Sequence, residues 1–380
     1  MTPETEEELA GIIKAADGPL RIEGGGTRPL GRASNGARLS TTRLSGIRLY
    51  EPGALTLVAG AGTPLAEIEA ALAAEGQGLA FEPMDHRGLL GTEGVPTLGG
   101  AVAANVSGPR RIQAGACRDF LLGVRFVDGQ GRIIRNGGRV MKNVTGYDLV
   151  KLMAGSYGTL GVLTEVALKV LPTARSTGVL RIEGLGDADA IAALSRALGS
   201  PFEVTGAAHL PRGDDGPVTL IRLEGSEASV AYRAREVQAL LAGYGRVTVD
   251  TDPASCAADW AQLRDVAPFH GRAGDVWRLS VKPTEAPAVV ADLPGTEALY
   301  DWGGGLIWLL VPEGCGAGAS EIHAAVAGRG GHAMRVRGDR SHPMFPPLAA
   351  PVAALQDGLR ARFDPAGILN PGLMAPMETA

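Results

Sequence analysis

The stretch RIEGGGTRPLG, residues 21–31, places three consecutive glycines directly after a short run that contains Ile22. Glycine loses more conformational entropy on folding than any other residue, so three in a row indicate a backbone that passes something bulky at close range. The N–H groups of such a row can form a concave site for an anion, and Thr27 adds a hydroxyl donor. A flexible surface turn is the alternative interpretation of these glycines taken alone.

Two common phosphate-binding motifs do not fit this stretch. The chain contains no GxxxxGK[ST] pattern, which leaves a mononucleotide P-loop unsupported. The strand–GxGxxG–helix arrangement of dinucleotide-binding folds is also missing, because Pro29 and Gly31 would interrupt a helix here. Any phosphate site at residues 24–27 is therefore of another kind.

The composition narrows the classes of protein that remain. The chain has 380 residues, enough for two or three domains, and its formal net charge of -5 argues against a nucleic-acid partner. Its 3 cysteines are far apart and form no CxxC, so we do not expect this chain alone to hold an iron–sulfur cluster or a thiolate zinc site. No run approaches the roughly 20 apolar residues of a membrane span, and the acidic N-terminus lacks the apolar core of a signal peptide.

Hydrophobic periodicity and turn residues predict alternating helices and strands. The clearest helix spans residues 63–76, with Thr63 as its N-cap, and a hairpin is expected around Asp128-Gly129. A Gly-rich loop is expected at 97–108, and no internal repeat is evident. Further helices are predicted at 1–18, 146–155, 187–199 and 226–245 and in the tail 355–374, and strands at 20–24, 55–62, 161–172, 217–225, 246–250, 276–283 and 306–312.

Four stretches, read together, resemble the FAD-binding domain of the vanillyl-alcohol oxidase/PCMH flavoprotein superfamily. They are RIEGGGTRPLG at 21–31, PTLGGAVAANVSG at 96–108, the long stretch at 143–172, and FDPAGILNPG at 363–372. The resemblance implies an α+β fold with a two-subdomain PCMH-type FAD-binding domain and an α+β cap domain. The FAD-binding domain would span 1–172, the cap or substrate domain 173–350, and a tail at 351–380 would return to the FAD domain.

Within this superfamily, the stretches 108–124, 143–163 and 330–340 resemble the E-subunit family of bacterial glycolate oxidase (glycolate dehydrogenase). This resemblance implies an FAD-dependent oxidoreductase acting on CH–OH donors. Glycolate, a small 2-hydroxyacid, would be oxidised to glyoxylate beside a D-type flavin subunit, and the electrons would pass to an iron–sulfur subunit and quinone. It also implies a cytoplasmic protein, whose contact with the inner face of the cytoplasmic membrane would be peripheral and through partners.

The resemblance assigns cofactor-binding roles to small residues, together with Arg28. The first loop would line the FAD pyrophosphate, a second loop would approach it closely, and residues 104–107 would lie beside the cofactor. A third loop would pass the adenosine end, and Asn370 would lie near the flavin. The residues implied are Gly24, Gly25, Gly26, Thr27, Arg28, Gly31, Thr97, Leu98, Gly99, Gly100, Ala104, Asn105, Ser107, Gly158, Thr159, Leu160, Gly161, Val162, Leu163 and Asn370.

The FAD is expected to be non-covalent. Relatives with a covalent flavin often carry a histidine in or near the first loop, where this chain has Thr27 and Arg28. Cys117 lies outside the loops just named and is interpreted as a buried structural cysteine. No metal site is predicted, because the HxGDGNxH element of D-subunit and D-lactate dehydrogenase relatives is missing, and His323, His332 and His342 do not reproduce its spacing.

No catalytic residue is assigned. Arg335 and Arg337 would share one face of a strand and could clamp a carboxylate, but a solvated strand face or a subunit contact is the favoured interpretation. Lys142 and Arg118 are interpreted as structural charges.

Three alternatives stay open at this point. The D-type partner could perform the chemistry, with this chain an electron-carrying or assembly subunit, and the missing His-rich element favours that version. The chain could instead be a stand-alone FAD-dependent hydroxyacid dehydrogenase. A flavin subunit of a molybdenum hydroxylase would share the fold, but it would usually show a different cap and no FDPAGILNPG tail.

Overall fold

The computed structural model describes every residue except 33–34, 140–145, 214–215, 342 and 377–380. The chain divides into two compact units. Unit 1 comprises residues 1–107, 115–173 and 340–379, and unit 2 comprises residues 108–114 and 174–339. The proposed boundaries at 172/173 and 350/351 differ from these divisions, because the return to unit 1 begins at Arg340 and the short segment 108–114 belongs to unit 2.

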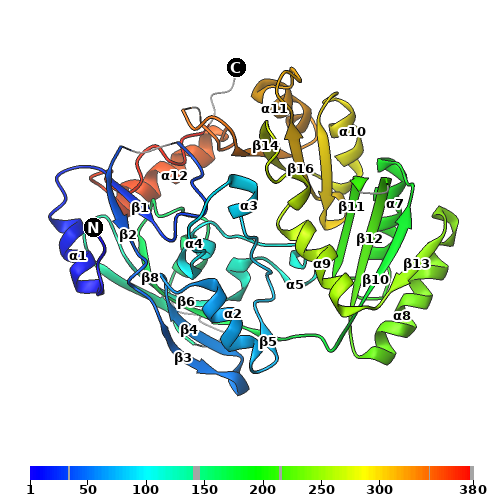
Figure 1. Ribbon diagram of the computed structural model, residues 1–380. Coiled ribbons are helices and arrows are strands. Elements are labelled where there is room, and N and C mark those ends of the chain that lie inside the picture. The colour runs from blue at the N-terminus through cyan, green and yellow to red at the C-terminus, as the bar shows by residue number, and fades with distance from the viewer. Residues whose placement is uncertain (33–34, 140–145, 214–215, 342, 377–380) are drawn as a thin grey trace. The chain divides into compact units, whose positions relative to one another are not determined.

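Unit 1 is built around a five-stranded antiparallel sheet in the order β3-β4-β8-β6-β7. The predicted hairpin is confirmed as β6 and β7. Figure 1 labels β3, β4, β8 and β6 of this sheet. A separate parallel pair, β1 and β2, is extended by the C-terminal tail, because Leu20 pairs with Leu369. The strands are β1 Leu20–Glu23, β2 Ala37–Ser40, β3 Ile47–Glu51, β4 Thr56–Gly60, β5 Gln77–Gly78, β6 Leu121–Val127, β7 Ile133–Gly137, β8 Val162–Lys169 and β9 Leu171–Pro172.

The helices of unit 1 follow ordinary capping chemistry. Helix α1 begins after Thr5, whose side chain accepts a hydrogen bond from the N–H of Glu8, and its apolar face buries Leu9 and Ile13. Helix α4 packs against β4 and β8. The helices are α1 Glu6–Lys14, α2 Leu65–Ala73, α3 Arg87–Leu90, α4 Leu98–Ala103, α6 Leu149–Met153 and α12 Ala350–Phe363.

Two predictions about unit 1 are wrong. Thr63 is not the N-cap of α2, because Pro64 occupies that position; the Thr63 hydroxyl instead donates to the Gly60 carbonyl and accepts from the Gly46 N–H. The region 97–108 is not all loop, because α4 occupies its first half and Thr97 caps that helix. Small residues at 98–103 suit a helix that packs closely, and this packing outweighs the low helix propensity of glycine.

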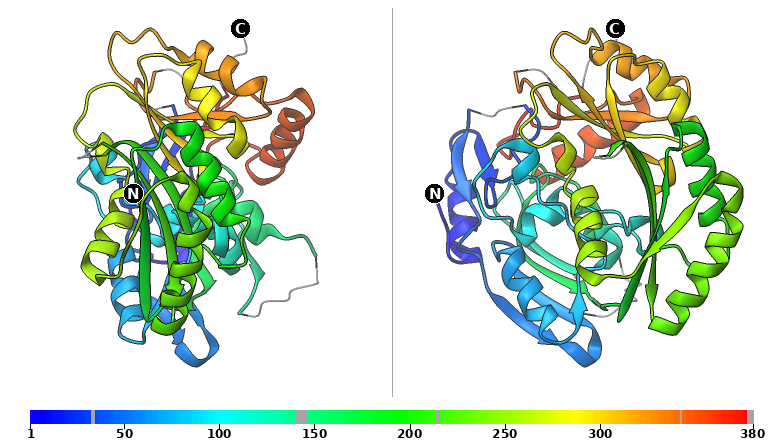
Figure 2. Two further views of the ribbon diagram at one scale, coloured as in Figure 1. Left: turned by 90° about the vertical axis from the view of Figure 1, so that its right-hand side faces the viewer. Right: turned by 45° about the vertical axis from the view of Figure 1, so that its right-hand side comes forward.

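Unit 2 contains an eight-stranded sheet in the order β13-β10-β12-β11-β15-β16-β14-β17. Helices α7 and α8, green in Figure 2, pack against β10, β11 and β12, whereas Trp260 of α9 lies by Gly206 on the other face. The strands are β10 Ser176–Glu183, β11 Gly206–Gly213, β12 Gly216–Gly225, β13 Val247–Asp250, β14 Asp275–Ser280, β15 Glu297–Asp301, β16 Leu306–Val311 and β17 His332–Arg337. The helices are α5 Arg111–Ala114, α7 Asp187–Leu198, α8 Glu227–Leu240, α9 Pro253–Arg264, α10 Ala286–Ala291 and α11 Ala319–Ala327.

The sheet of unit 2 repeats one topology twice, which the sequence does not reveal. Strands β10 to β13 with α7 and α8 follow the order strand–helix–strand–strand–helix–strand, and strands β14 to β17 with α10 and α11 follow it again. In both halves the first strand lies between the third and the fourth, as in ferredoxin-like folds. The two halves join through β11 and β15, so the eight strands form one continuous sheet.

A buried polar cluster lies at the junction of the two halves. His209 of β11 pairs with Tyr300 of β15, and both side chains are fully buried. The Tyr300 hydroxyl donates to Asp187 at the start of α7 at 2.5 Å, and Nδ1 of His209 lies 2.9 Å from the Thr219 hydroxyl. We name His209, Tyr300, Asp187 and Thr219 the seam cluster, because its members link both halves of the sheet.

The short segment 108–114 is held within unit 2 by polar contacts. Trp302 donates from Nε1 to the Gly108 carbonyl at 3.1 Å, and the Arg111 guanidinium lies 4.7 Å from the centre of the Trp302 ring. Arg110 forms an ion pair with the buried carboxylate of Glu224. These contacts explain why seven residues from the middle of the flavoprotein-like region belong to the second unit.

Among the described helices, none is both long and apolar enough to cross a membrane.

Candidate cofactor-binding site

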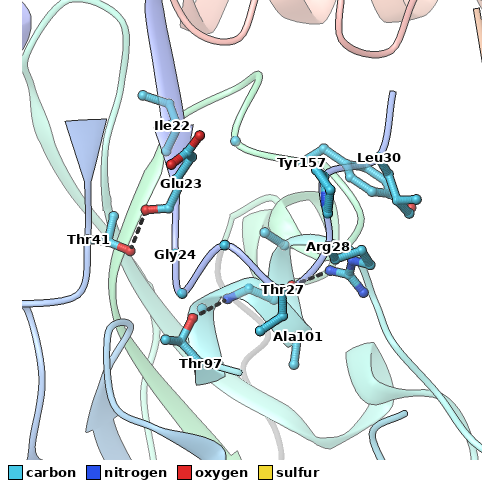
Figure 3. Close-up of a pocket in the computed structure, with 18 of the residues that line it drawn as sticks. Ile22, Glu23, Gly24, Thr27, Arg28, Leu30, Thr41, Thr97, Ala101 and Tyr157 are labelled. Atoms are coloured by element: carbon cyan, nitrogen blue, oxygen red, sulfur yellow. Dashed lines mark hydrogen bonds between the residues drawn. The ribbon is translucent and has the colours of Figure 1, made fainter. Parts of the chain in front are cut away.

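Unit 1 contains a cavity of about 320 Å³, within the usual size range of small-molecule sites. Four segments that are distant in sequence line it: the loop after β1, the segment around α4, the turn before β8, and the C-terminal return. Figure 3 shows the loop from Gly24 to Arg28 passing above Thr97 and Ala101, with Tyr157 on its other side.

The three glycines of the first loop serve two different needs. A Cβ on Gly25 would stand 1.5 Å from the Val95 carbonyl oxygen, and one on Gly24 would stand 2.6 Å from the Thr97 hydroxyl. Gly26 meets nothing within 4 Å but has φ +75°, a conformation that residues with a side chain rarely adopt. The bulky neighbour that Gly24 and Gly25 pass is therefore the protein's own segment 94–97, while Gly26 supplies the bend.

The first loop presents a row of backbone donors. Among the described residues, none accepts a hydrogen bond from the N–H groups of Gly24 to Arg28, although the carbonyls of Gly25 and Thr27 accept from Val95 and Thr92. Backbone N–H groups inside a folded protein are nearly always paired with protein, water or a ligand. Five consecutive donors beside a cavity have the composition of an anion-binding nest.

The segment around α4 contributes surface rather than donors. The N–H groups of Leu98 and Gly99 already donate to the carbonyls of Thr63 and Ala61, and the Gly100 N–H donates to the Thr97 hydroxyl. A Cβ on Gly99 would stand 2.7 Å from the Ala61 side chain. The small residues of this segment thus allow α4 to pack closely on its own unit and bring its backbone to the cavity wall.

Asn370 joins two walls of the cavity. Its side chain accepts from the Ile22 N–H at 2.7 Å and donates to the Tyr157 carbonyl at 2.9 Å. The residue is buried and has φ +45°, which asparagine tolerates better than most residues. Both functions of the amide are thus used to tie β1 to the turn before β8, and Asn370 lines the cavity as a support.

The cavity carries more positive than negative side chains. The Arg28 guanidinium donates to the Gly100 carbonyl at 2.6 Å, and burial lowers its pKa. Arg340 donates from Nε to the Gly31 carbonyl at 3.2 Å, and burial lowers its pKa as well. Glu23 is the one acidic residue among the described residues of the lining, and it is bound by Arg21 and Arg38 at 2.7 and 2.6 Å.

The structure brings most of the residues implied by the resemblance to the cavity. Those that line it are Gly24, Gly25, Gly26, Thr27, Arg28, Thr97, Gly99, Gly100, Ala104, Gly158, Gly161, Val162, Leu163 and Asn370. Six others are near but do not line it: Gly31, Leu98, Asn105, Ser107, Thr159 and Leu160.

These six residues have visible structural contacts instead. Leu98 and Leu160 are buried apolar side chains, and Thr159 donates to the Ser156 carbonyl at 2.7 Å. Asn105 accepts from the Arg118 N–H, and Ser107 accepts from the Cys117 N–H, both at 3.0 Å. These last two bonds join residues 105–107 to residues 117–118, so they connect the chain of unit 1 on either side of segment 108–114.

Sequence reasoning missed several residues of the lining. Tyr157 has φ +53° and packs edge-on against Phe345 at 5.0 Å, and buried His86 has Nδ1 3.2 Å from the Met84 carbonyl. The missed cations of the lining are Arg21, Arg32 and Arg340. No motif surrounds His86 or Arg340, and only the fold brings them to the cavity, although the SYG preceding the β8 strand pattern was a usable signal for a tight turn at Tyr157.

The other residues considered from sequence are accounted for locally. Burial raises the pKa of the Cys117 thiol to about 12, which suits a structural cysteine and an unreactive thiol. Arg335 pairs with Asp275 at 3.3 Å and donates to the Asp339 carbonyl, and Arg337 donates to the carbonyls of Gly274 and Phe269. Both arginines thus fasten β17 within unit 2. Lys142 and His342 lie outside the described residues. Within the part of the chain that the structure describes, no group of His, Cys, Asp and Glu could hold a metal ion.

Comparisons with known proteins agree with this geometry. A family described as FAD binding domain matches residues 1–137. The glycolate oxidase subunit GlcE of Escherichia coli (strain K12) is 41% identical, over 94% of this chain and 92% of that protein. D-lactate dehydrogenase of Archaeoglobus fulgidus is 34% identical over 47% of this chain and 40% of that protein, and glycolate oxidase subunit GlcD of Bacillus subtilis is 41% identical over 26% and 20%.

Solved structures share the architecture at much lower identity. Alkyldihydroxyacetonephosphate synthase has a TM-score of 0.71 at 17% identity, covering 98% of this chain and 76% of that one. Chitooligosaccharide oxidase has a TM-score of 0.67 at 14% identity, covering 100% and 91%. At these identities the likeness concerns the fold, and it confirms the predicted α+β class.

Proposed function

Because the chain belongs to the family of the glycolate oxidase subunit GlcE, we propose that it carries FAD in the unit 1 cavity and serves in the oxidation of glycolate to glyoxylate. The reaction class is oxidation of a CH–OH donor, which also fits the relationship to D-lactate dehydrogenase. When bound, the flavin supplies the acceptor for the two electrons that leave the hydroxyacid carbon.

The observation that carries this proposal is the row of N–H groups from Gly24 to Arg28, which donate to no described residue. A diphosphate needs several donors at close range, and backbone N–H groups provide them without bulky side chains. The glycines of the loop also leave the backbone open to a ligand at Gly26, where a Cβ would meet nothing within 4 Å. The residues present therefore fit the diphosphate of FAD.

The protein's own residues would bind and position this cofactor. The loop from Gly24 to Arg28 would hold the diphosphate, Arg28 would add charge, and α4 would provide a close, apolar wall. Asn370 would keep the opposite walls together through its two backbone contacts. Positioning of this kind fixes the reactive part of a cofactor relative to its substrate.

We propose that the FAD is non-covalent. The first loop has Thr27 and Arg28 where a flavin-linking histidine would stand, and Cys117 is fully buried with a raised pKa. Acid precipitation should then release all flavin into the supernatant. Flavin that stays with the precipitated chain would contradict this part of the proposal.

The partners proposed are a D-type flavin subunit and an iron–sulfur subunit, in a cytoplasmic complex whose membrane contact is made by partners. The names of the two similar subunits, GlcE and GlcD, describe parts of a multi-subunit glycolate oxidase. The three cysteines Cys117, Cys256 and Cys315 are unpaired and lie in separate elements, so this chain offers no obvious cluster ligands. A separate subunit would therefore have to accept the electrons one at a time.

Anaerobic reduction by glycolate tests the proposal. We expect the purified chain to be yellow and its flavin absorbance to bleach when glycolate is added, alone or once the D-type subunit is present. Bleaching of the isolated chain assigns the chemistry to its own flavin. Bleaching that requires the partner identifies an electron-carrying or assembly subunit. A chain that binds no FAD in either preparation would contradict the proposed function.

A further inference from the structure

We propose that Arg340 is a second cationic ligand of the FAD diphosphate, acting with Arg28. This inference rests on the proposed function, because it concerns the same cavity. It adds a residue from late in the chain. Among the stretches that carry the resemblance, only 330–340 contains Arg340, as its last residue.

Arg340 stands where the C-terminal return meets the first loop. It lines the cavity, and its Nε donates to the Gly31 carbonyl at 3.2 Å. Gly31 is also held by Met344, whose sulfur accepts from its N–H at 3.2 Å, and a Cβ on Gly31 would stand 2.3 Å from the Leu373 carbonyl oxygen. The end of the first loop is thus held by Arg340, Met344 and Leu373.

The charges around Arg340 do not balance. Burial lowers its pKa, Arg21 lowers it further, and Glu23 alone raises it. Glu23 is already engaged by Arg21 and Arg38, so one carboxylate faces three guanidiniums. Arg28 adds a fourth cation, and the neighbouring groups that raise its pKa are Tyr157 and Cys117, neither of which is a carboxylate.

Positive charge that is at least partly removed from water, as at Arg28 and Arg340, costs free energy unless an anion neutralises it. The diphosphate of FAD carries two negative charges, and an arginine fork matches phosphate oxygens better than any other side chain. The N–H row of Gly24 to Arg28 and the guanidiniums of Arg28 and Arg340 line one cavity. Together they form a cationic and donor-rich site suited to a dianion.

Titration of the full-length apo-protein with FAD tests the inference. We expect Arg340→Met to weaken FAD binding about 10- to 100-fold, the usual range for a lost hydrogen bond to a charged group. Arg340→Lys keeps the charge and should weaken binding less. Arg43→Met removes an equal charge at an exposed ion pair with Glu4, away from the cavity, and should change the dissociation constant less than about two-fold.

The salt dependence separates a charge role from simple support of Gly31. The dissociation constant of the wild type should rise more steeply with salt than that of Arg340→Met, because the variant has lost one charge–charge contact. Equal salt dependence with equal losses in the Met and Lys variants would overturn the inference and assign Arg340 to loop support. Unchanged affinity in Arg340→Met would also overturn it, whereas a wild type that binds no FAD would contradict the proposed function itself.

Discussion

The glycines of the first loop show how one residue type answers two physical demands. Gly24 and Gly25 allow the segment 94–97 to approach the loop, and Gly26 adopts a left-handed backbone conformation. The sequence indicates that something must come close, but it does not say what. The structure shows that close packing within the protein shapes the loop, and that the loop lines the cavity while its N–H groups donate to no described residue.

Gly25→Ala should disrupt this loop. The added methyl would overlap the Val95 carbonyl oxygen, so the loop or the segment 94–97 must move, at a cost of about 1–3 kcal/mol for overpacking. We expect at least a ten-fold loss of FAD affinity in titrations. Gly11→Ala is the matched control, because a Cβ there meets nothing within 4 Å in α1, and it should stabilise the protein by about 0.5–1 kcal/mol. Equal behaviour of the two variants would contradict this explanation.

Asn370→Ala should loosen the cavity walls. It leaves the Ile22 N–H and the Tyr157 carbonyl without their partner and places alanine at φ +45°. We expect a loss of about 1–3 kcal/mol in the free energy of unfolding, measured by urea denaturation. Asn35→Ala, at an exposed position, should stay within about 0.5 kcal/mol of the wild type. A similar effect at both positions would show that the Asn370 contacts are not significant.

At the residue scale, a site residue could be predicted where its own sequence neighbours reveal its role. The special role of the glycines at 24–26 could be predicted, because three consecutive glycines cost conformational entropy and so indicate a backbone with an unusual requirement. Arg340 and His86 could not be assigned, because their role depends on which distant segments the fold brings together. The φ of Tyr157 was equally hidden, since a tyrosine gives no local sign of a left-handed conformation.

At the scale of elements, helix α4 was misread because its glycines resemble loop residues. Gly99 is required there by contact with Ala61, which is tertiary information. The hairpin β6–β7 was predicted correctly because Asp128-Gly129 is a strong local turn signal. Local signals are thus reliable where they set the backbone by themselves and unreliable where packing decides.

The seam cluster provides a test at this scale. Tyr300→Phe removes the hydroxyl that donates to Asp187 in a fully buried position. We expect the free energy of unfolding to fall by about 1–3 kcal/mol. Tyr232→Phe, on the exposed side of α8, should change it by less than about 0.5 kcal/mol. A Tyr300→Phe protein as stable as the control would show that the cluster does not stabilise the junction of the two halves.

The same cluster predicts a dependence on pH. The His209 imidazole, whose Nε2 lies 3.5 Å from the Asp187 carboxylate, and then the hydrogen bond from Tyr300 hold the pKa of Asp187 below its usual value. A depressed pKa contributes stability that is fully present above the unfolded value, about 3.9, and is lost as pH falls through the lower folded value. The stability difference between wild type and Asp187→Asn should therefore be constant above about pH 5 and shrink below about pH 4. A difference that grows on acidification would contradict this sign.

At the scale of the whole molecule, each of the two units has its own sheet. The duplicated strand–helix–strand–strand–helix–strand order of unit 2 was not visible in the sequence, because topology can repeat without repeating any motif. The return of the tail to unit 1 was suggested by FDPAGILNPG, and Leu369 pairs there with Leu20. The segment 108–114 could not be placed from the sequence, because its anchors Glu224 and Trp302 lie far away in the chain.

The central claim is that the backbone N–H groups of Gly24 to Arg28 bind the diphosphate of FAD. A crystal structure of the chain saturated with FAD tests it most directly. We predict diphosphate oxygens within about 3 Å of several of these nitrogens, the ordinary length of an N–H···O hydrogen bond. FAD found elsewhere, with no ligand atom near this loop, would contradict the account.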